Sequence, residues 1–310
     1  MNSGKTERLF WLLAFISALL ACIYVSIVIA KRYNARTFHT LIDNTNYPIY
    51  KIPFPEVVIC NQNRLNWQRM EAAQQRFLHR QHRTPALKSL FARILATYDN
   101  VTFGNFNNFQ ALAKESKVQL RELNYVNFTN VVDFMAWRCN EIFQRCTWGS
   151  APINCCDIFI KRRSQYGQCL AFNAVEGAVG EQMMRLDPTW PWRTSKYGQK
   201  SGLTVRVLLN EHQHSPNSTN DKGITLMLGE PFVYFSVPTD IPKNTQTRIA
   251  IDAVMHFYDD QTRSVSSSKR ECVFEDEQNS ADFKSLIGHK YMFENCQSQC
   301  QQEYLMNFCN

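Results

Sequence analysis

The chain has 310 residues, of which 45% are hydrophobic and 20% are charged, so it can form one large folded domain or two smaller ones, and a disordered tail is excluded. Lysine and arginine exceed aspartate and glutamate by 34 to 27. This excess is scattered apart from segments 69–83 and 161–163, which are more typical of solvated faces, so the sequence does not favour nucleic acid as a partner.

The first element is an uncharged segment, residues 9–30, with basic residues on both sides. At about 1.5 Å per residue, a helix of this length crosses the roughly 30 Å hydrocarbon core of a membrane. A signal peptide cleaved after Ala30 is the alternative, but the apolar part of a signal peptide usually has only about 7 to 15 residues. We therefore predict a transmembrane helix over 9–30 that follows a short cytoplasmic segment, 1–8.

The side of the membrane is indicated by the region that follows, because the basic residues flanking the span are ambiguous. Ten of the eleven cysteines lie after the span, which is typical of a region that folds in an oxidising compartment. Three sequons for N-glycosylation agree, at Asn100, Asn127 and Asn217. We therefore predict that residues 31–310 form an extracellular region.

Within this region the pattern changes from helical to strand-like. Apolar residues at helical spacing predict helices within 67–77 and 87–98. Alternating apolar residues predict strands over 203–209 and 248–258, and a third strand over 231–238 is framed by prolines. The expected fold class is α+β, with an antiparallel sheet that carries a helical outgrowth.

No motif for catalysis or cofactor binding was found. The sequence has no nucleophile elbow, paired-histidine zinc helix, phosphate loop or dinucleotide fingerprint, so we expect neither an enzyme nor a cofactor nor a metal site. His212 and His214 could share a metal on one strand face, but the turn-rich segment 215–223 favours an exposed loop. The adjacent residues Cys155 and Cys156 cannot pair with each other without strain, so each pairs elsewhere or one stays free.

Five motifs follow one another behind the span: FPEVVIC with NQNRLNW (54–67), CNEIFQRC (139–146), YGQCLAFN (166–173), GLTVRVLLN (202–210) and RECVFEDE (270–277). In order and spacing they resemble the degenerin/epithelial sodium channel family of amiloride-sensitive sodium channels over residues 9–310. The TWG that follows Cys146 and the NCCDIF of residues 154–159 resemble the insect pickpocket branch in particular.

The resemblance implies a subunit of a homo- or heterotrimeric channel in the plasma membrane that is selective for sodium ions and blocked by amiloride. It also implies a hand-shaped extracellular domain, with the strands in a palm, the helices of 67–98 in a finger, and a disulfide-rich thumb. An extracellular stimulus would shift this domain, and strain passed to the membrane helices would open the sodium path.

The resemblance further assigns cysteine pairs. It implies the disulfides Cys60–Cys169 and Cys139–Cys146. It places in the thumb four cysteines whose partners in the family lie on a second thumb helix: Cys272, Cys296, Cys300 and Cys309. From the residues alone, Cys296 and Cys300 lie four apart on one helical face, which is too far for comfortable pairing with each other.

Relative to this family we expect a chain truncated at both ends and an incomplete extracellular domain. No match is found to the cytoplasmic His-Gly gating motif, to the selectivity filter or to the second membrane helix, so no pore residue is assigned here. Two alternatives stay open. The chain could be a pore-less single-pass glycoprotein that regulates full-length subunits, or a secreted disulfide-rich protein.

Overall fold

The computed structural model combines an N-terminal apolar helix, antiparallel sheets and further helices, which confirms the α+β class. It describes residues 3–35, 41–101, 105–175, 177–198, 200–216, 218–219, 223–234, 237–270, 272–278, 283–285 and 290–308. The chain divides into two compact units, one formed by Met1–Tyr47 with Met255–Phe283 and the other by Pro48–Val254 with Lys284–Asn310.

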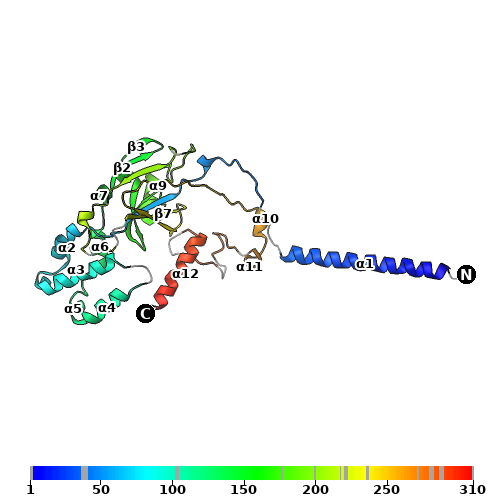
Figure 1. Cartoon of the computed structure of the whole chain (residues 1–310), viewed down its shortest axis with the longest axis horizontal. Helices are drawn as coiled ribbons and strands as arrows, with labels where there is room; N and C mark the ends of the chain where they lie inside the picture. The colour runs from blue at the N-terminus through cyan, green and yellow to red at the C-terminus, as the bar shows by residue number, and fades with distance from the viewer. Residues whose placement is uncertain are drawn as a thin grey trace. The chain divides into compact units, whose positions relative to one another are not determined.

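The first unit contains the long helix α1, Ser3–Ala35, drawn in blue in Figure 1. The segment Gly4–Tyr33 has a mean hydropathy of 2.7, and none of its most apolar stretch is buried. An apolar surface of this length is unfavourable in water, whereas it matches the hydrocarbon core of a bilayer. Helix α1 contains the predicted span 9–30 and extends beyond it at both ends.

Two short helices of the same unit are α10, Asp260–Arg263, and α11, Ser267–Arg270. Phe274 is buried there, with the guanidinium carbons of Arg263 and Arg270 at 4.6 and 4.4 Å from its ring centre. Cations packed on an aromatic face hold this small cluster together.

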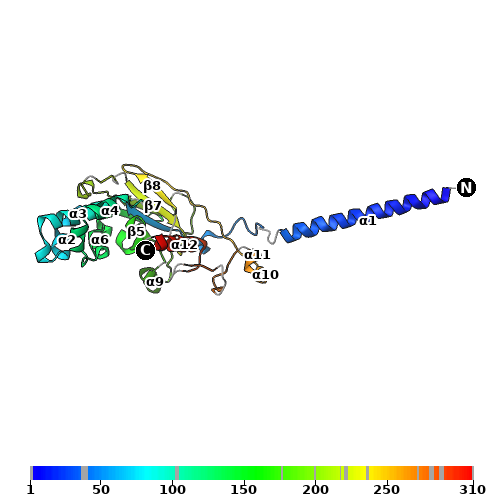
Figure 2. The same cartoon turned by 90° about the horizontal axis from the view of Figure 1, so that it is seen from below.

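The second unit is built on a five-stranded antiparallel sheet with the strand order β4-β5-β1-β7-β8 (Figure 2). Its strands are β1 (Glu56–Asn61), β4 (Phe159–Ser164), β5 (Gly167–Phe172), β7 (Gly223–Gly229) and β8 (Pro238–Pro242). All six residues of the central strand β1 are buried. The sheet is thus covered on both faces at its centre.

Side chains on β1 alternate between these two faces, as strand geometry requires. Val57 and Ile59 belong to a cluster that is rich in aromatic residues and contains Phe172. Val58 and Cys60 belong to a smaller cluster on the opposite face. Burial on both sides fixes the register of β1, because a shift by one residue would exchange the two sets.

A second antiparallel sheet has the order β3-β2-β6 and consists of β2 (Phe143–Trp148), β3 (Ala151–Ile153) and β6 (Leu203–Val207). The hairpin between β2 and β3 turns through Gly149 and Ser150, whose φ angles are 55° and 74°. Two successive residues with positive φ are typical of the tight turn that suits the twist of paired strands. Strand β6 lies within the predicted segment 203–209.

Helices between β1 and β2 form a separate layer, which lies to one side of the sheets in Figure 1. Its elements are η2 (Trp67–Arg69), α2 (Met70–Phe77), η3 (Arg80–His82), α3 (Pro85–Asp99), α4 (Asn107–Glu115), α5 (Lys117–Arg121) and α6 (Phe128–Met135). Thr84 caps α3 by accepting a hydrogen bond from the Leu87 amide at 3.3 Å, and Pro85 takes the first helical position. The helices predicted over 67–77 and 87–98 are confirmed.

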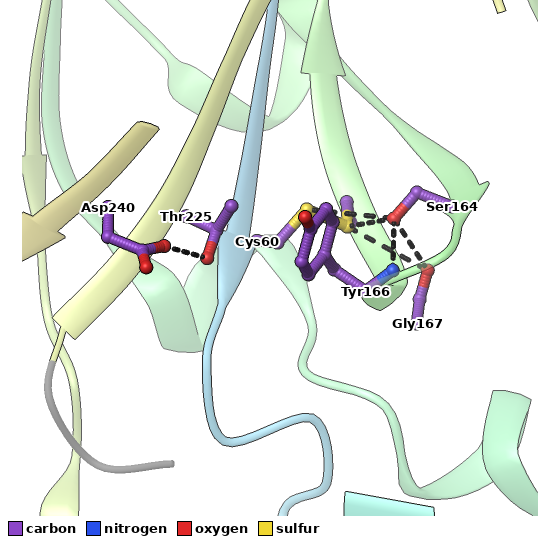
Figure 3. The surroundings of a disulfide bond; sticks show 7 residues. Cys60, Ser164, Tyr166, Gly167, Thr225 and Asp240 are labelled. Carbon is purple, nitrogen blue, oxygen red and sulfur yellow. Dashed lines mark hydrogen bonds between the residues drawn. A yellow bond between two sulfur atoms is a disulfide. The ribbon is translucent and has the colours of Figure 1, made fainter. Parts of the chain in front are cut away.

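The disulfide Cys60–Cys169, which the resemblance implies, is present and joins β1 to β5 (Figure 3). The neighbouring pair in the ladder is Ile59 opposite Leu170, so the two cysteines face each other across the strands. Their Cα atoms are 4.5 Å apart, the spacing of a narrow antiparallel pair. Figure 3 shows the Tyr166 ring beside the sulfur atoms.

The expected pair Cys139–Cys146 is wrong, because two other disulfides join Cys139 to Cys156 and Cys146 to Cys155. Cys139 begins the short helix α7, Cys139–Ile142, and the adjacent cysteines begin the short helix α8, Cys155–Ile158. Successive side chains on a helix point about 100° apart. Cys155 therefore bonds to strand β2 while Cys156 bonds to α7, so each of the adjacent cysteines pairs elsewhere.

Two strand predictions are also wrong. Residues 248–258 form no regular element, because no neighbouring strand offers hydrogen bonds to them in the part that the structure describes. The described residues of 231–238 form turns until β8 begins at Pro238. The remaining elements are η1 (Ile49–Lys51), α9 (Gly177–Leu186), η4 (Glu211–Gln213) and α12 (Phe293–Phe308).

Candidate functional site

The chain leaves helix α1 and enters the sheet at Glu56, the first residue of β1. The Glu56 side chain is only 1% exposed and forms an ion pair with Arg162 of β4, across the intervening strand β5. A buried pair of opposite charges is stable only when its polar atoms find further partners. This position links the residues that follow helix α1 to the far edge of the sheet.

Arg162 finds its further partners in the segment after β7. Its guanidinium donates hydrogen bonds of 2.8 Å to the carbonyl oxygens of Val233 and Tyr234. Its central carbon also lies 5.6 Å from the centre of the Tyr234 ring. The second carboxylate oxygen of Glu56 has no hydrogen-bond partner within the described part of the chain. Loss of Arg162 would therefore leave a buried charge without compensation.

The same segment is bound by helix α12 through Asn295, which is fully buried. The Asn295 side chain accepts a hydrogen bond from the Tyr234 amide at 2.7 Å and donates to the carbonyl oxygens of Phe232 and Lys290, both at 2.9 Å. A continuous series of polar contacts thus runs from Glu56 through Arg162 and residues 232–234 to α12. We call it the Glu56–Asn295 polar relay.

A second buried polar group joins the helical layer to the sheet at Asp99, the last residue of α3. Its carboxylate accepts hydrogen bonds from the Arg64 amide at 2.7 Å, from Asn63 Nδ2 at 3.1 Å and from the Ser218 hydroxyl at 2.9 Å. Asn63 and Arg64 follow directly on β1. The end of α3 is therefore fixed against the end of the central strand.

The Arg64 side chain completes this junction. Its guanidinium donates to the carbonyl oxygens of Tyr98, in the last turn of α3, at 2.9 Å and of Val101, just after the helix, at 2.6 Å. Burial raises the pKa of Asp99 and lowers the pKa of Arg64, because both charged forms lose water. Burial likewise raises the pKa of Tyr98. In this junction the charges of Asp99, Arg64 and Tyr98 interact, and each charged form is destabilised by burial.

These two polar groups can position elements and transmit movement between them, but they offer no covalent chemistry. In the described residues, no three His, Cys, Asp or Glu side chains come together as a metal site. His212 lies exposed in η4, and a ring nitrogen of His214 lies 2.8 Å from the Leu209 carbonyl oxygen. The histidine pair of the sequence therefore lies in a loop and not in a strand.

The predicted modification sites and thumb cysteines lie in different parts of the chain. Asn100 follows α3, and the exposed Asn127 caps α6 by accepting from the Asn130 amide at 3.2 Å. Cys272, Cys296 and Cys300 carry free thiols, and the last two lie on α12. Asn217 and Cys309 lie outside the described residues.

The sequence did not single out the residues of the polar relay or of the junction. The triplet 161–163 was interpreted as a solvated face from its charge alone. Alternation along β4 places Arg162 on the opposite face from Lys161 and Arg163, and a carboxylate, Glu56, stands at the start of an apolar strand. These two signals together could have predicted the pair.

Known proteins resemble the whole chain. The family model described as "Amiloride-sensitive sodium channel" matches residues 1–310. Pickpocket protein 19 of Drosophila melanogaster is 28% identical over 312 residues, which are 98% of this chain and 59% of that protein. Sodium channel protein Nach of Drosophila melanogaster is 22% identical over 326 residues, 99% of this chain and 58% of that protein. The chain thus spans about three-fifths of the length of these curated relatives.

Proposed function

Because the chain belongs to the amiloride-sensitive sodium channel family, we propose that it is a subunit of a sodium-selective cation channel that amiloride blocks. The family consists of ion channels and not of enzymes. The observation that carries the proposal is the match of the family model to residues 1–310. An apolar helix without buried surface, α1, agrees with a membrane location.

The proposed subunit lies in the plasma membrane with residues 1–8 in the cytoplasm and residues 31–310 outside the cell. Three disulfides support an oxidising environment for the region after α1. The sequons at Asn100 and Asn127 support the same side, and we propose that both asparagines carry glycans.

We assign the five-stranded sheet to the palm, the helices α2 to α6 to the finger, and α12 to the thumb. Helix α12 carries Cys296 and Cys300, whose partners the resemblance assigns to a second thumb helix. The subunit assembles with two identical or related subunits into a trimer. These assignments rest on the family and on the order of the elements along the chain.

Within this subunit the Glu56–Asn295 polar relay provides a path for movement. A displacement of α12 would act on residues 232–234 through Asn295, and on Glu56 through Arg162. Glu56 begins the strand that the chain enters after the membrane helix, so strain on β1 would reach α1 along the backbone. A mechanical link of this kind is one way in which a two-state element couples an extracellular stimulus to a membrane helix.

Electrical recording tests the proposed function. The native transcript that encodes residues 1–310 is expressed in oocytes, alone and with related subunits, and surface labelling verifies delivery to the membrane. We expect an inward current that requires external sodium and falls when amiloride is added. A chain that reaches the surface in every combination without any sodium current above that of uninjected cells would contradict the proposal.

A further inference from the structure

Positive charge is concentrated in the helical layer. Residues 67–126 contain nine lysines and arginines against four aspartates and glutamates, which gives +5 of the net +7 of the chain. Two of the four carboxylates are already engaged, because Asp99 is buried in its junction and Glu115 pairs with Arg93 at 2.6 Å. Arg93 is thereby neutralised, and Arg69 pairs with Glu141 outside the segment. Seven cations then face the exposed carboxylates of Glu71 and Glu122, so the surface of this layer keeps a charge of about +5.

Aromatic stacking brings two basic segments of the layer together. The Tyr125 ring stacks on His79 with 4.1 Å between ring centres, and it lies 5.3 Å from the ring of His82. The Tyr125 hydroxyl also accepts a hydrogen bond from the His79 amide at 3.1 Å. Tyr125 follows α5 by one turn, so this contact places the end of α5 beside η3.

We define the basic tip as five residues on the two joined segments: Arg76, Arg80, Arg83, Lys117 and Arg121. Arg83 binds the carbonyl oxygens of Leu78 and Gln75 at the end of α2, and Arg76 lies over the rings of Phe77 and Phe134. These contacts leave both positive charges without a neutralising carboxylate.

The other three cations of the tip are available for a partner. Arg80, Lys117 and Arg121 are exposed, and no ion pair joins them to a carboxylate in the described part of the chain. Glu122 is the acidic residue next to Arg121 in sequence, and it is exposed as well. Unpaired cations of this density raise the local potential and attract a flexible polyanion.

The cations of the tip are spread over separate elements, α2, η3 and α5, which suits an extended ligand better than a small anion. Planar guanidinium groups bind sulfate oxygens in pairs, and lysine adds a point charge. We propose that the basic tip binds a sulfated glycosaminoglycan of the extracellular matrix. The choice of an extracellular polymer rests on the proposed function, which places this region outside the cell.

Heparin serves as the probe. The full chain, purified in detergent, is passed over immobilised heparin at increasing salt, and the dissociation constant is measured. The triple variant Arg80→Ala, Lys117→Ala, Arg121→Ala should bind heparin at least about tenfold more weakly, with a shallower dependence on salt, because fewer counterions are released. Equal melting temperatures show that the triple variant has the native fold.

The matched control removes the same charge elsewhere. Lys161, Lys196 and Lys200 are exposed, and their replacement by alanine should change heparin affinity by less than about twofold. An equal loss in both triple variants, or no heparin binding by the native chain, would overturn the proposal. Tighter binding to vesicles of anionic lipid or to RNA than to heparin would also overturn it.

This test is separate from that of the channel. Heparin binding depends on the tip alone and does not require a sodium current. A channel without heparin binding would refute only the inference about the tip. Heparin binding by a chain whose tip faces the cytoplasm would refute the extracellular partner together with the proposed topology.

Discussion

Two regions of the molecule carry the same kinds of residues and differ in what those residues contact. In the sheet region, residues 56–242, all six cysteines are paired and the apolar residues of β1 are buried. In the C-terminal region, residues 245–308, the described cysteines are free thiols. Apolar residues at 249–257 are exposed there, including Phe257 at 67%.

A pattern of alternating apolar residues therefore forms a strand only where a neighbouring strand can pair with it. The alternation at 248–258 is as regular as that of β6, yet β6 has the ladder of β2 beside it. A strand buries its backbone groups only by pairing with another strand. The two regions should therefore respond differently to changes in their ion pairs, cysteines and carboxylates.

Breaking an ion pair should produce the largest difference in the free energy of unfolding between the two regions. Replacement of Arg162 by alanine leaves Glu56 buried without a partner, which should lower the free energy of unfolding by about 3–5 kcal/mol. The matched change in the C-terminal region is Lys284→Ala, which breaks an exposed pair with Glu303 and should leave stability unchanged within error. Urea unfolding followed by tryptophan fluorescence measures both.

A double variant separates charge from packing. Glu56→Met with Arg162→Met removes both charges and keeps the volume, so it should recover most of the stability lost in Arg162→Ala. Equal losses for Arg162→Ala and Lys284→Ala would show that the two regions do not differ in the way described.

Replacing cysteines should produce the second largest difference in the free energy of unfolding. The Cys60–Cys169 disulfide closes a loop with a sequence separation of 109 residues, and its removal by Cys60→Ser with Cys169→Ser should cost about 2–5 kcal/mol. Cys300→Ser in the C-terminal region removes an exposed free thiol and should change the unfolding free energy by less than about 0.5 kcal/mol. A large loss for Cys300→Ser would indicate that this thiol has a partner.

The ionisation of carboxylates should change stability the least. Its dependence on pH should have opposite signs in the two regions. Burial raises the pKa of Asp99 above 3.8, so its stabilisation is fully present below pH 3.8 and is lost as the pH rises through the folded pKa. A hydrogen bond from Arg263 lowers the pKa of Asp276, so its stabilisation is present above pH 3.8 and is lost as the pH falls through the folded pKa.

Melting temperatures of asparagine variants test these signs. The melting temperature of the native chain minus that of Asp99→Asn should fall between pH 4 and neutral pH, whereas the difference for Asp276→Asn should rise from acidic pH toward pH 4. A flat or rising difference for Asp99→Asn would show that burial does not control its ionisation.

The sequence predicted those parts of the fold that depend on local patterns. The apolar stripe of 87–98 and the capping residues Thr84 and Pro85 are sufficient for α3. The strand expected over 248–258 failed because alternation does not reveal whether a partner strand exists. The pairing of Cys139 failed because spacing along the chain does not give the directions of side chains on α7 and α8.

The buried polar contacts were harder to predict for a physical reason. Arg162 and Glu56 are 106 residues apart, and only the strand order brings them together across β5. Asp99 and Ser218 likewise meet through the fold and share no local signal. Long-range polar contacts depend on topology, whereas helix stripes and caps depend on residues a few positions apart.

In the proposed topology, α1 crosses the membrane and the folded region lies outside the cell. The most direct test inserts an epitope tag after the exposed residue Lys196 and compares antibody staining of intact and permeabilised cells. We expect intact cells to stain as strongly as permeabilised cells. If the chain is present in the surface fraction but stains only after permeabilisation, the proposed topology is contradicted.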